Sequence, residues 1–128
     1  MQGIHFRTFT GAEDFPAMAA CANASFAADG LGIVRSADDM ARDYASFTAC
    51  VPTRDVWIAQ AGEEITGYVR GWQFEQRDGV RVYPQFGVVA PRWRRLGIGT
   101  ALQSWIEARQ RDTQRTIPRR RATCTRPS

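Results

Sequence analysis

The sequence predicts a single α+β domain with the element order β-α-α-β-β-β-α, and three observations lead to this prediction. The chain has 128 residues, 44% of them hydrophobic, which suits one domain with a modest core and excludes two independent domains. Stretches with alternating apolar residues predict strands, whereas apolar residues three or four positions apart predict helices. The three central strands follow one another through short turns, so we expect them to pair antiparallel.

One strand and two helices are predicted in the N-terminal third. Apolar and polar residues alternate over residues 3–9, which predicts the first strand, and Thr10-Gly11 ends it. From Ala12 the apolar residues fall on one helical face until an Asp-Gly-Leu-Gly turn. Ser36, followed three residues later by Asp39, resembles a capping box, so a second helix begins there and extends to the proline at position 52.

The central part of the chain predicts three strands joined by tight turns: residues 54–60, 65–76 and 80–89. The first turn contains Gly62, and Asp78-Gly79 is a strong hairpin signal. Pro84 and Gly87 fit a central ladder poorly, so the third strand should contain a bulge or an unpaired stretch.

The C-terminal part predicts one amphipathic helix over residues 99–111, with Leu102 and Ile106 in its apolar stripe. Ile117 is the only large apolar residue beyond it, and the rest is polar and rich in arginine. Such a segment cannot contribute much to a core. We therefore expect a folded domain over residues 1–111 and a disordered tail over residues 112–128.

Charge and composition exclude several classes of protein. The net charge is +4, which divides into −4 over residues 1–91 and +8 over residues 92–128, and all 17 basic residues are arginine. No apolar run is long enough to span a membrane, and no leader-like segment opens the chain. Because Cys21, Cys50 and Cys124 are odd in number and far apart, we expect reduced thiols, no metal site and a cytoplasmic protein. His5 is the only histidine, which argues against a His-dependent triad.

The segment with the clearest chemical signal is VVAPRWRRLGIGT, residues 88–100, where a strand leads through a loop into the last helix. Gly97 and Gly99 allow a tight turn and a close approach of the backbone to a ligand. The first N–H groups of a helix lack intrahelical partners and favour an anion. Three arginines in the same loop add positive charge, so the segment predicts a phosphate or pyrophosphate site.

This segment resembles motif A of the GCN5-related N-acetyltransferase (GNAT) superfamily, with Val89-Ala90-Pro91 followed by Arg94-Arg95-Leu96-Gly97-Ile98-Gly99. The order of the predicted elements is also that of the family, so the resemblance covers residues 3–111. It implies a mixed, mainly antiparallel sheet and the transfer of an acetyl group from acetyl-CoA to a primary amine of a small molecule or a protein. The segment does not fit a Rossmann dinucleotide-binding fingerprint, because Leu102 stands where that motif needs a small residue. It does not fit a P-loop either, because that motif needs a lysine and the chain has none.

The resemblance also implies roles for individual residues. The backbone groups of Val88 and Val89 would pair with the pantetheine arm of acetyl-CoA. The loop and the helix start would hold its pyrophosphate through Arg94, Arg95, Gly97, Ile98, Gly99 and Thr100. Trp93 is expected to pack beneath the loop.

The general base is harder to predict. Members of the family often carry a carboxylate on the strand before motif A, but here that strand contains Gln85, which cannot accept a proton. Glu75 and Tyr83 are weak candidates, with a solvated hairpin position and strand packing as their alternatives.

The family continues after the motif A helix with a further strand and helix, and neither is visible here. We therefore expect a truncated form of the fold, with an exposed sheet edge that permits self-association. Two alternative functions remain open: a non-catalytic CoA-binding module, and nucleic-acid binding through the arginine-rich tail. The second is disfavoured because that tail has no aromatic residue for stacking on bases. No membrane partner is expected.

Overall fold

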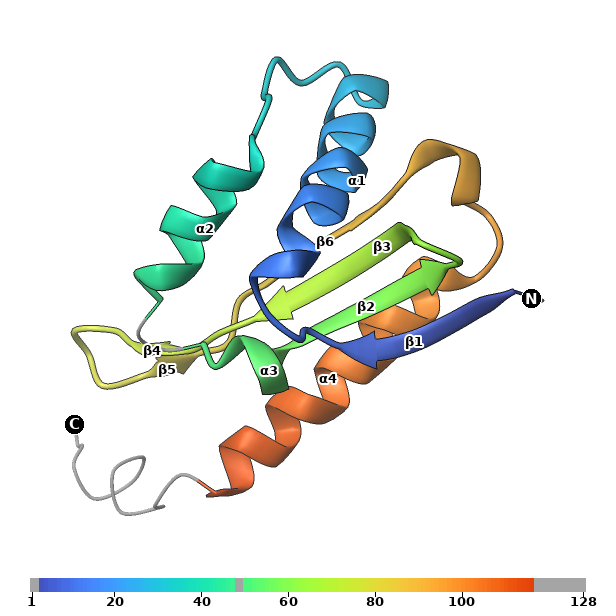
Figure 1. The fold of residues 1–128 in the computed structure, drawn as a ribbon. Coiled ribbons are helices and arrows are strands. Elements are labelled where there is room, and N and C mark those ends of the chain that lie inside the picture. The colour runs from blue at the N-terminus through green and yellow to red at the C-terminus, as the bar shows by residue number, and fades with distance from the viewer. Residues whose placement is uncertain (1–2, 48–49, 117–128) are drawn as a thin grey trace.

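A four-stranded antiparallel sheet with the order β1-β2-β3-β6 lies between two helical layers in the computed structural model (Figure 1). The structure describes residues 3–47 and 50–116. The sheet strands are β1 (Ile4–Thr8), β2 (Val56–Ala61), β3 (Glu64–Gly71) and β6 (Gln85–Val89). A separate hairpin consists of β4 (Phe74–Glu75) and β5 (Arg81–Val82). All ladders among the described residues are antiparallel, so the parallel pairing that a mixed sheet requires is not present there.

The helices cover the two faces of the sheet differently. On one face lie α1 (Phe15–Ala28), which follows a one-turn 3-10 helix η1 (Ala12–Asp14), and α2 (Ala37–Ala45). On the other face α4 (Ile98–Thr116) crosses β2, β3 and β6 (Figure 1). None of the helices in the described part of the chain is long and apolar enough to cross a bilayer.

The predicted capping box of α2 is confirmed. The backbone N–H of Asp39 donates to the Ser36 Oγ, and the Ser36 N–H donates to the Asp39 carboxylate at 2.9 Å. The preceding loop is fixed to α1 because the Asn23 amide bonds both backbone groups of Arg35, at 2.7 and 2.8 Å. This anchor sets the position of α2 over the sheet.

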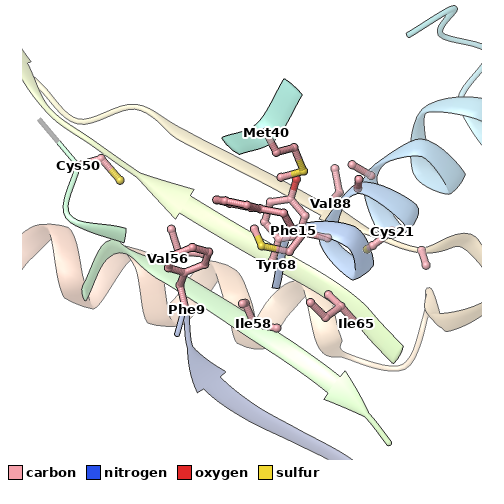
Figure 2. Close-up of a cluster of buried hydrophobic side chains, with 14 residues drawn as sticks. Phe9, Phe15, Cys21, Met40, Cys50, Val56, Ile58, Ile65, Tyr68 and Val88 are labelled. Atoms are coloured by element: carbon pink, nitrogen blue, oxygen red, sulfur yellow. The ribbon is translucent and has the colours of Figure 1, made fainter. Parts of the chain in front are cut away.

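Each face of the sheet has its own hydrophobic core. Figure 2 shows the larger one, where Phe15 of α1 and Met40 of α2 meet Tyr68 of β3 and Val88 of β6. On the opposite face, Ile106 of α4 is fully buried in a second cluster. These two layers fix β6 between α1 and α4.

The two long strands predicted from the sequence are each divided. The predicted strand 65–76 forms β3 and β4, and the predicted strand 80–89 forms β5 and β6. Pro84 explains the break in the second strand. Its carbonyl accepts a hydrogen bond from the Trp72 N–H at 3.2 Å, but proline has no N–H that could donate to the Trp72 carbonyl and continue the ladder. The predicted hairpin at Asp78-Gly79 is confirmed, with Gly79 at φ 89°. Gly87, in contrast, pairs regularly with Val69.

Two predicted boundaries are wrong. Arg54 and Asp55 belong to a one-turn helix, α3 (Pro52–Asp55), because Pro52 occupies a favourable first-turn position. The last helix continues from Arg111 to Thr116, so the expected tail begins with a helical segment. The apolar stripe ends earlier, but glutamine and arginine are good helix formers and no glycine or proline interrupts the chain before Pro118. The rest of the predicted tail, residues 117–128, lies outside the described residues.

Candidate functional site

The loop before α4 has the backbone geometry of an anion cradle. Arg95 and Gly97 both adopt left-handed conformations, with φ of 69° and 88°. The first intrahelical bond in this region is donated by the Ala101 N–H to the Gly97 carbonyl. The N–H groups of Ile98, Gly99 and Thr100 therefore have no acceptor among the described residues. Three free donors thus gather at the positive end of a 19-residue helix.

Arg94 holds this loop against α1. Its Nη1 donates to Asp29 Oδ1 at 3.1 Å, its Nη2 donates to the buried Ser25 Oγ at 2.8 Å, and its Nε donates to the Val89 carbonyl at 3.0 Å. The side chain consequently connects helix, strand and loop. It positions the backbone cradle and is not free to close around a ligand.

The other two arginines of the loop differ in their partners. Arg92 Nη1 lies 3.9 Å from Glu64 Oε1, whereas Arg95 is exposed and has no carboxylate partner among the described residues. The charges of Arg92 and Arg94 are therefore balanced by carboxylates from distant parts of the chain, which the sequence did not predict. Arg95 remains as the cation available to an anion in the cradle.

Trp93 packs as expected beneath the loop. Its ring contacts both hydrophobic clusters, and its Nε1 donates to Glu64 Oε2 at 3.1 Å. This anchors the short 3-10 helix η2 (Pro91–Trp93) that precedes the cradle.

The register of β6 determines which of its backbone groups are free. The Ala90 N–H donates to the Thr66 carbonyl, and Pro84 accepts from Trp72, so even-numbered residues of β6 bond β3. Val88 is one of these, and its backbone is not available to a ligand. Gly87 and Val89 instead direct their N–H groups to the outer edge, which no strand covers in the described part of the chain. Of the expected pair, Val89 thus has its N–H at the open edge and Val88 does not, while Gly87 is a second residue with outward backbone groups. The pairing of this edge with pantetheine and self-association through it both stay predictions.

A cavity of about 230 Å³ lies between this edge and the start of α4. We call it the β6–α4 cleft, and its lining residues are Val69, Gln85, Gly87, Val88, Val89, Gly99, Leu102 and Gln103. A Cβ added at Gly99 would meet only the Val89 Cγ2, at 3.7 Å, and would therefore project into the cleft without disturbing the fold. The sequence analysis missed Gly87, Leu102 and Gln103, although the helical spacing of the last two from Gly99 is a signal that could have identified them.

A second cavity, of about 290 Å³, lies on the opposite face of the sheet and is called the α1–α2 pocket. Its lining residues are Ala22, Phe26, Ile33, Arg35, Met40, Asp43, Tyr44, Ser46, Phe47, Tyr68, Arg70 and Phe86. The two cavities share β6, because Phe86 faces the pocket while Gly87 faces the cleft. Ligands in the two cavities would therefore lie on either side of this strand.

The structure does not bring the two candidate catalytic residues into either cavity. Glu75 lies on the separate hairpin, with its Oε1 3.7 Å from the Arg81 guanidinium. Tyr83 lines a different, small cavity near Gln110. Gln85 does line the cleft, where its amide accepts from Gln103 and donates to Gln110, at 2.7 and 2.9 Å.

Burial keeps several hydroxyl and thiol groups near the cavities protonated. Burial raises the pKa values of Tyr44 and Tyr68, and it raises the pKa of the Cys21 thiol to about 12. Cys50 is a second buried free thiol, whereas Cys124 lies outside the described residues. No three metal-ligating side chains come together within residues 3–47 and 50–116.

The comparisons with known proteins agree with this geometry. The family model of the acetyltransferase (GNAT) domain matches residues 52–126, which is more than half of the chain. No curated protein matches the sequence closely enough to count as a relative.

Several solved structures share the fold. A GCN5-related N-acetyltransferase from Sphaerobacter thermophilus is 25% identical with a TM-score of 0.75, and the match covers 92% of this chain but only 35% of that protein. A GNAT family acetyltransferase from Brucella melitensis, solved with acetyl-CoA, is 17% identical with a TM-score of 0.66, over 88% of this chain and 71% of the other. An aminoglycoside acetyltransferase from an uncultured soil metagenomic sample, solved with sisomicin, is 15% identical with a TM-score of 0.61, over 91% and 74%.

Proposed function

Because the chain belongs to the GNAT acetyltransferase family, we propose that it is an acyl-CoA N-acyltransferase that transfers an acetyl group from acetyl-CoA to a primary amine. The observation that carries this proposal is the cradle of free backbone donors at the start of α4, which lies directly beside the open edge of β6. A pyrophosphate and an extended pantetheine chain require these two features side by side.

The pyrophosphate is assigned to the cradle on electrostatic grounds. The N–H groups of Ile98, Gly99 and Thr100 would bind its oxygens, and the dipole of α4 favours the negative charge. Arg95 would add one ion pair, while Arg94 keeps the loop in place through Asp29 and Ser25. The solved complex of the Brucella protein with acetyl-CoA supports this cofactor choice.

The pantetheine arm is assigned to the β6–α4 cleft. Its amide groups would bond the outward carbonyl of Gly87 and the outward N–H of Val89, as an added strand does. Leu102 and Val69 supply an apolar wall, and the glutamine pair Gln85–Gln103 closes the end of the cleft away from the cradle. This arrangement brings the thioester next to the point where β6 separates the cleft from the α1–α2 pocket.

The reaction is an acyl transfer between the two cavities. The nitrogen of a neutral amine in the α1–α2 pocket forms a bond to the thioester carbon, the carbon–sulfur bond breaks, and the sulfur leaves as thiolate. The amine nitrogen loses one proton, and one proton converts the thiolate to the thiol. An outward N–H of Gly87 is positioned to polarise the carbonyl, and proximity accounts for much of the remaining acceleration.

The alternative is a non-catalytic module that binds CoA, since the chain spans only 35% of the Sphaerobacter protein. Two measurements separate the alternatives. Isothermal titration with acetyl-CoA tests binding, and release of free thiol in the presence of a panel of primary amines tests transfer. Binding without thiol release for any amine would exclude the enzyme, and the absence of binding would exclude both.

A further inference from the structure

Arg70 presents an unpaired positive charge inside the α1–α2 pocket. Its guanidinium carbon lies 4.4 Å from the ring centroid of Phe47 and 4.4 Å from that of Trp72. The side chain is partly buried, and no carboxylate within the described residues pairs with it. A cation in such an apolar setting favours an anionic partner.

The hydrogen-bond donors of Arg70 are available. Its guanidinium donates no hydrogen bond to any described residue, and the neighbouring Phe47 and Trp72 rings offer no oxygen that could accept one. Contact with two rings limits the freedom of the side chain, which lowers the entropy that binding would cost. A planar guanidinium matches a carboxylate, which it can bind through two parallel hydrogen bonds.

A second polar group in the same pocket lacks a partner. The Tyr44 hydroxyl is the only buried side-chain nitrogen or oxygen without a hydrogen bond among the described residues. Tyr44 lines the pocket beside Arg70, whose guanidinium carbon lies 5.9 Å from the Tyr44 ring centroid. A buried hydroxyl without a partner is costly, so a polar ligand group that reached the Tyr44 hydroxyl would be favoured.

The remaining charges of the pocket cancel. Arg35 and Asp43 form an ion pair with each other, so Arg70 determines the sign of the electrostatic potential. A polycationic amine would meet this unpaired cation and find no free carboxylate in the lining. The pocket therefore disfavours polycations and favours an acceptor with a negative group.

The other walls of the pocket are apolar and enclose a small volume. Phe26, Ile33, Met40 and Phe86 provide the apolar surface. The volume of about 290 Å³ lies at the lower limit of the range of about 300–1,000 Å³ typical for ligand pockets. This size suits one apolar side chain with a short polar head.

We propose that the acceptor is an amine that also carries a carboxylate, namely a small apolar α-amino acid or dipeptide, with its carboxylate on Arg70. This rests on the proposed acetyl transfer and specifies its second substrate. Arg70 lies directly opposite Phe86 in the β3–β6 register, so a carboxylate there is held next to the strand at which the thioester is placed. Arg70 thereby selects the acceptor and orients its amine.

Equilibrium binding of the acetylated product tests the carboxylate directly. N-acetyl-L-phenylalanine and N-acetylphenethylamine differ only in this group, and we expect the first to bind the parent protein at least tenfold more tightly by calorimetry. Arg70→Met should reduce this ratio to about one, and Arg70→Lys, which keeps the charge without the planar fork, should give an intermediate ratio. Arg42→Met is the matched control, because Arg42 lies on the exposed side of α2 and outside the pocket lining.

Kinetics supply the second readout. For thiol release, the KM of L-phenylalanine should be at least tenfold below that of phenethylamine or spermidine. Arg70→Met should remove this difference in KM. The Kd of this variant for acetyl-CoA should stay within twofold of the parent value. Equal binding of the two acetylated products by the parent, or an unchanged ratio in Arg70→Met, would overturn the assignment of the acceptor. A failure of acetyl-CoA to bind would instead overturn the proposed function, and the comparison of the two products would still decide the role of Arg70.

Discussion

Gly99 allows a direct test of the cradle, because its substitution has opposite expected effects on the free and the bound protein. Gly99 is exposed, and a Cβ there approaches only Val89, at 3.7 Å, so Gly99→Glu should fold normally. A carboxylate in the first turn of α4 interacts favourably with the helix dipole, by about 0.3–1 kcal/mol. We therefore expect the free variant to be at least as stable as the parent.

Binding should show the reverse effect. A carboxylate about 5 Å from a phosphate charge costs about 3 kcal/mol at an effective dielectric constant of about 20, which weakens binding by more than about 100-fold. At about 100 times its Kd, acetyl-CoA stabilises the parent by about 2.7 kcal/mol, or about 10 °C in Tm for a domain of this size. The same concentration should raise the Tm of the variant by only about 1 °C.

Thermal unfolding with and without acetyl-CoA measures both effects. Gly32→Glu is the matched control, because Gly32 is exposed, has nothing within 4 Å of an added Cβ, and lies in the loop between α1 and α2. This control should be protected as well as the parent. Equal protection of the Gly99→Glu and Gly32→Glu variants would refute the assignment of the cradle.

Three further substitutions test the fold around the site. Gly71→Ala places a Cβ 2.7 Å from the Ile106 Cδ1 and should lower the free energy of unfolding by about 1–3 kcal/mol in urea titrations; an unchanged midpoint would contradict the packing of α4. Arg94→Met should cost about 1 kcal/mol of stability and also weaken acetyl-CoA binding in calorimetry, whereas loss of stability alone would limit Arg94 to a structural role. Burial raises the pKa of Asp14, but hydrogen bonds led by Arg7 outweigh it and lower the pKa below 3.8, so the stability from this pair is complete above that pH and is lost as the pH falls through the lowered value. Asp14→Asn should flatten that acid-side decline in a series of urea titrations, and an unchanged slope would contradict the ion pair.

Local signals predicted the elements that position the site. The spacing of Ser36 and Asp39 located the start of α2, and Asp78-Gly79 located the β4–β5 hairpin. Each of these depends on neighbouring residues alone. The strand–loop–helix sequence around Gly97 likewise depends on local backbone requirements, so the cradle was predictable from the motif.

Contacts between distant residues were not predictable. The resemblance implied a cofactor contact for Arg94, but nothing in the sequence indicated its bonds to Asp29 and Ser25, 65 and 69 positions away in the chain. The contacts of Arg70 with Phe47 and Trp72 depend on the alternation of β3 and on the packing of the segment after α2 against the sheet. A single sequence carries no local pattern for either contact.

The inventory of titratable groups constrains how the amine loses its proton. Asp43 is the only carboxylate that lines either cavity within the described residues, and it is paired with Arg35. Burial raises the pKa values of Tyr44 and Tyr68 above 10, so these phenols stay protonated at neutral pH and cannot act as general bases. Without a general base in the lining, the amine must reach the thioester already neutral.

The requirement for a neutral amine discriminates between acceptors. A peptide α-amino group, with a pKa of about 8, is neutral in about one molecule in ten at pH 7. A lysine side chain, with a pKa of about 10.4, is neutral in about one molecule in a few thousand. The chemistry of the pocket therefore favours peptide α-amino groups over lysine side chains, in agreement with a dipeptide acceptor whose carboxylate binds Arg70.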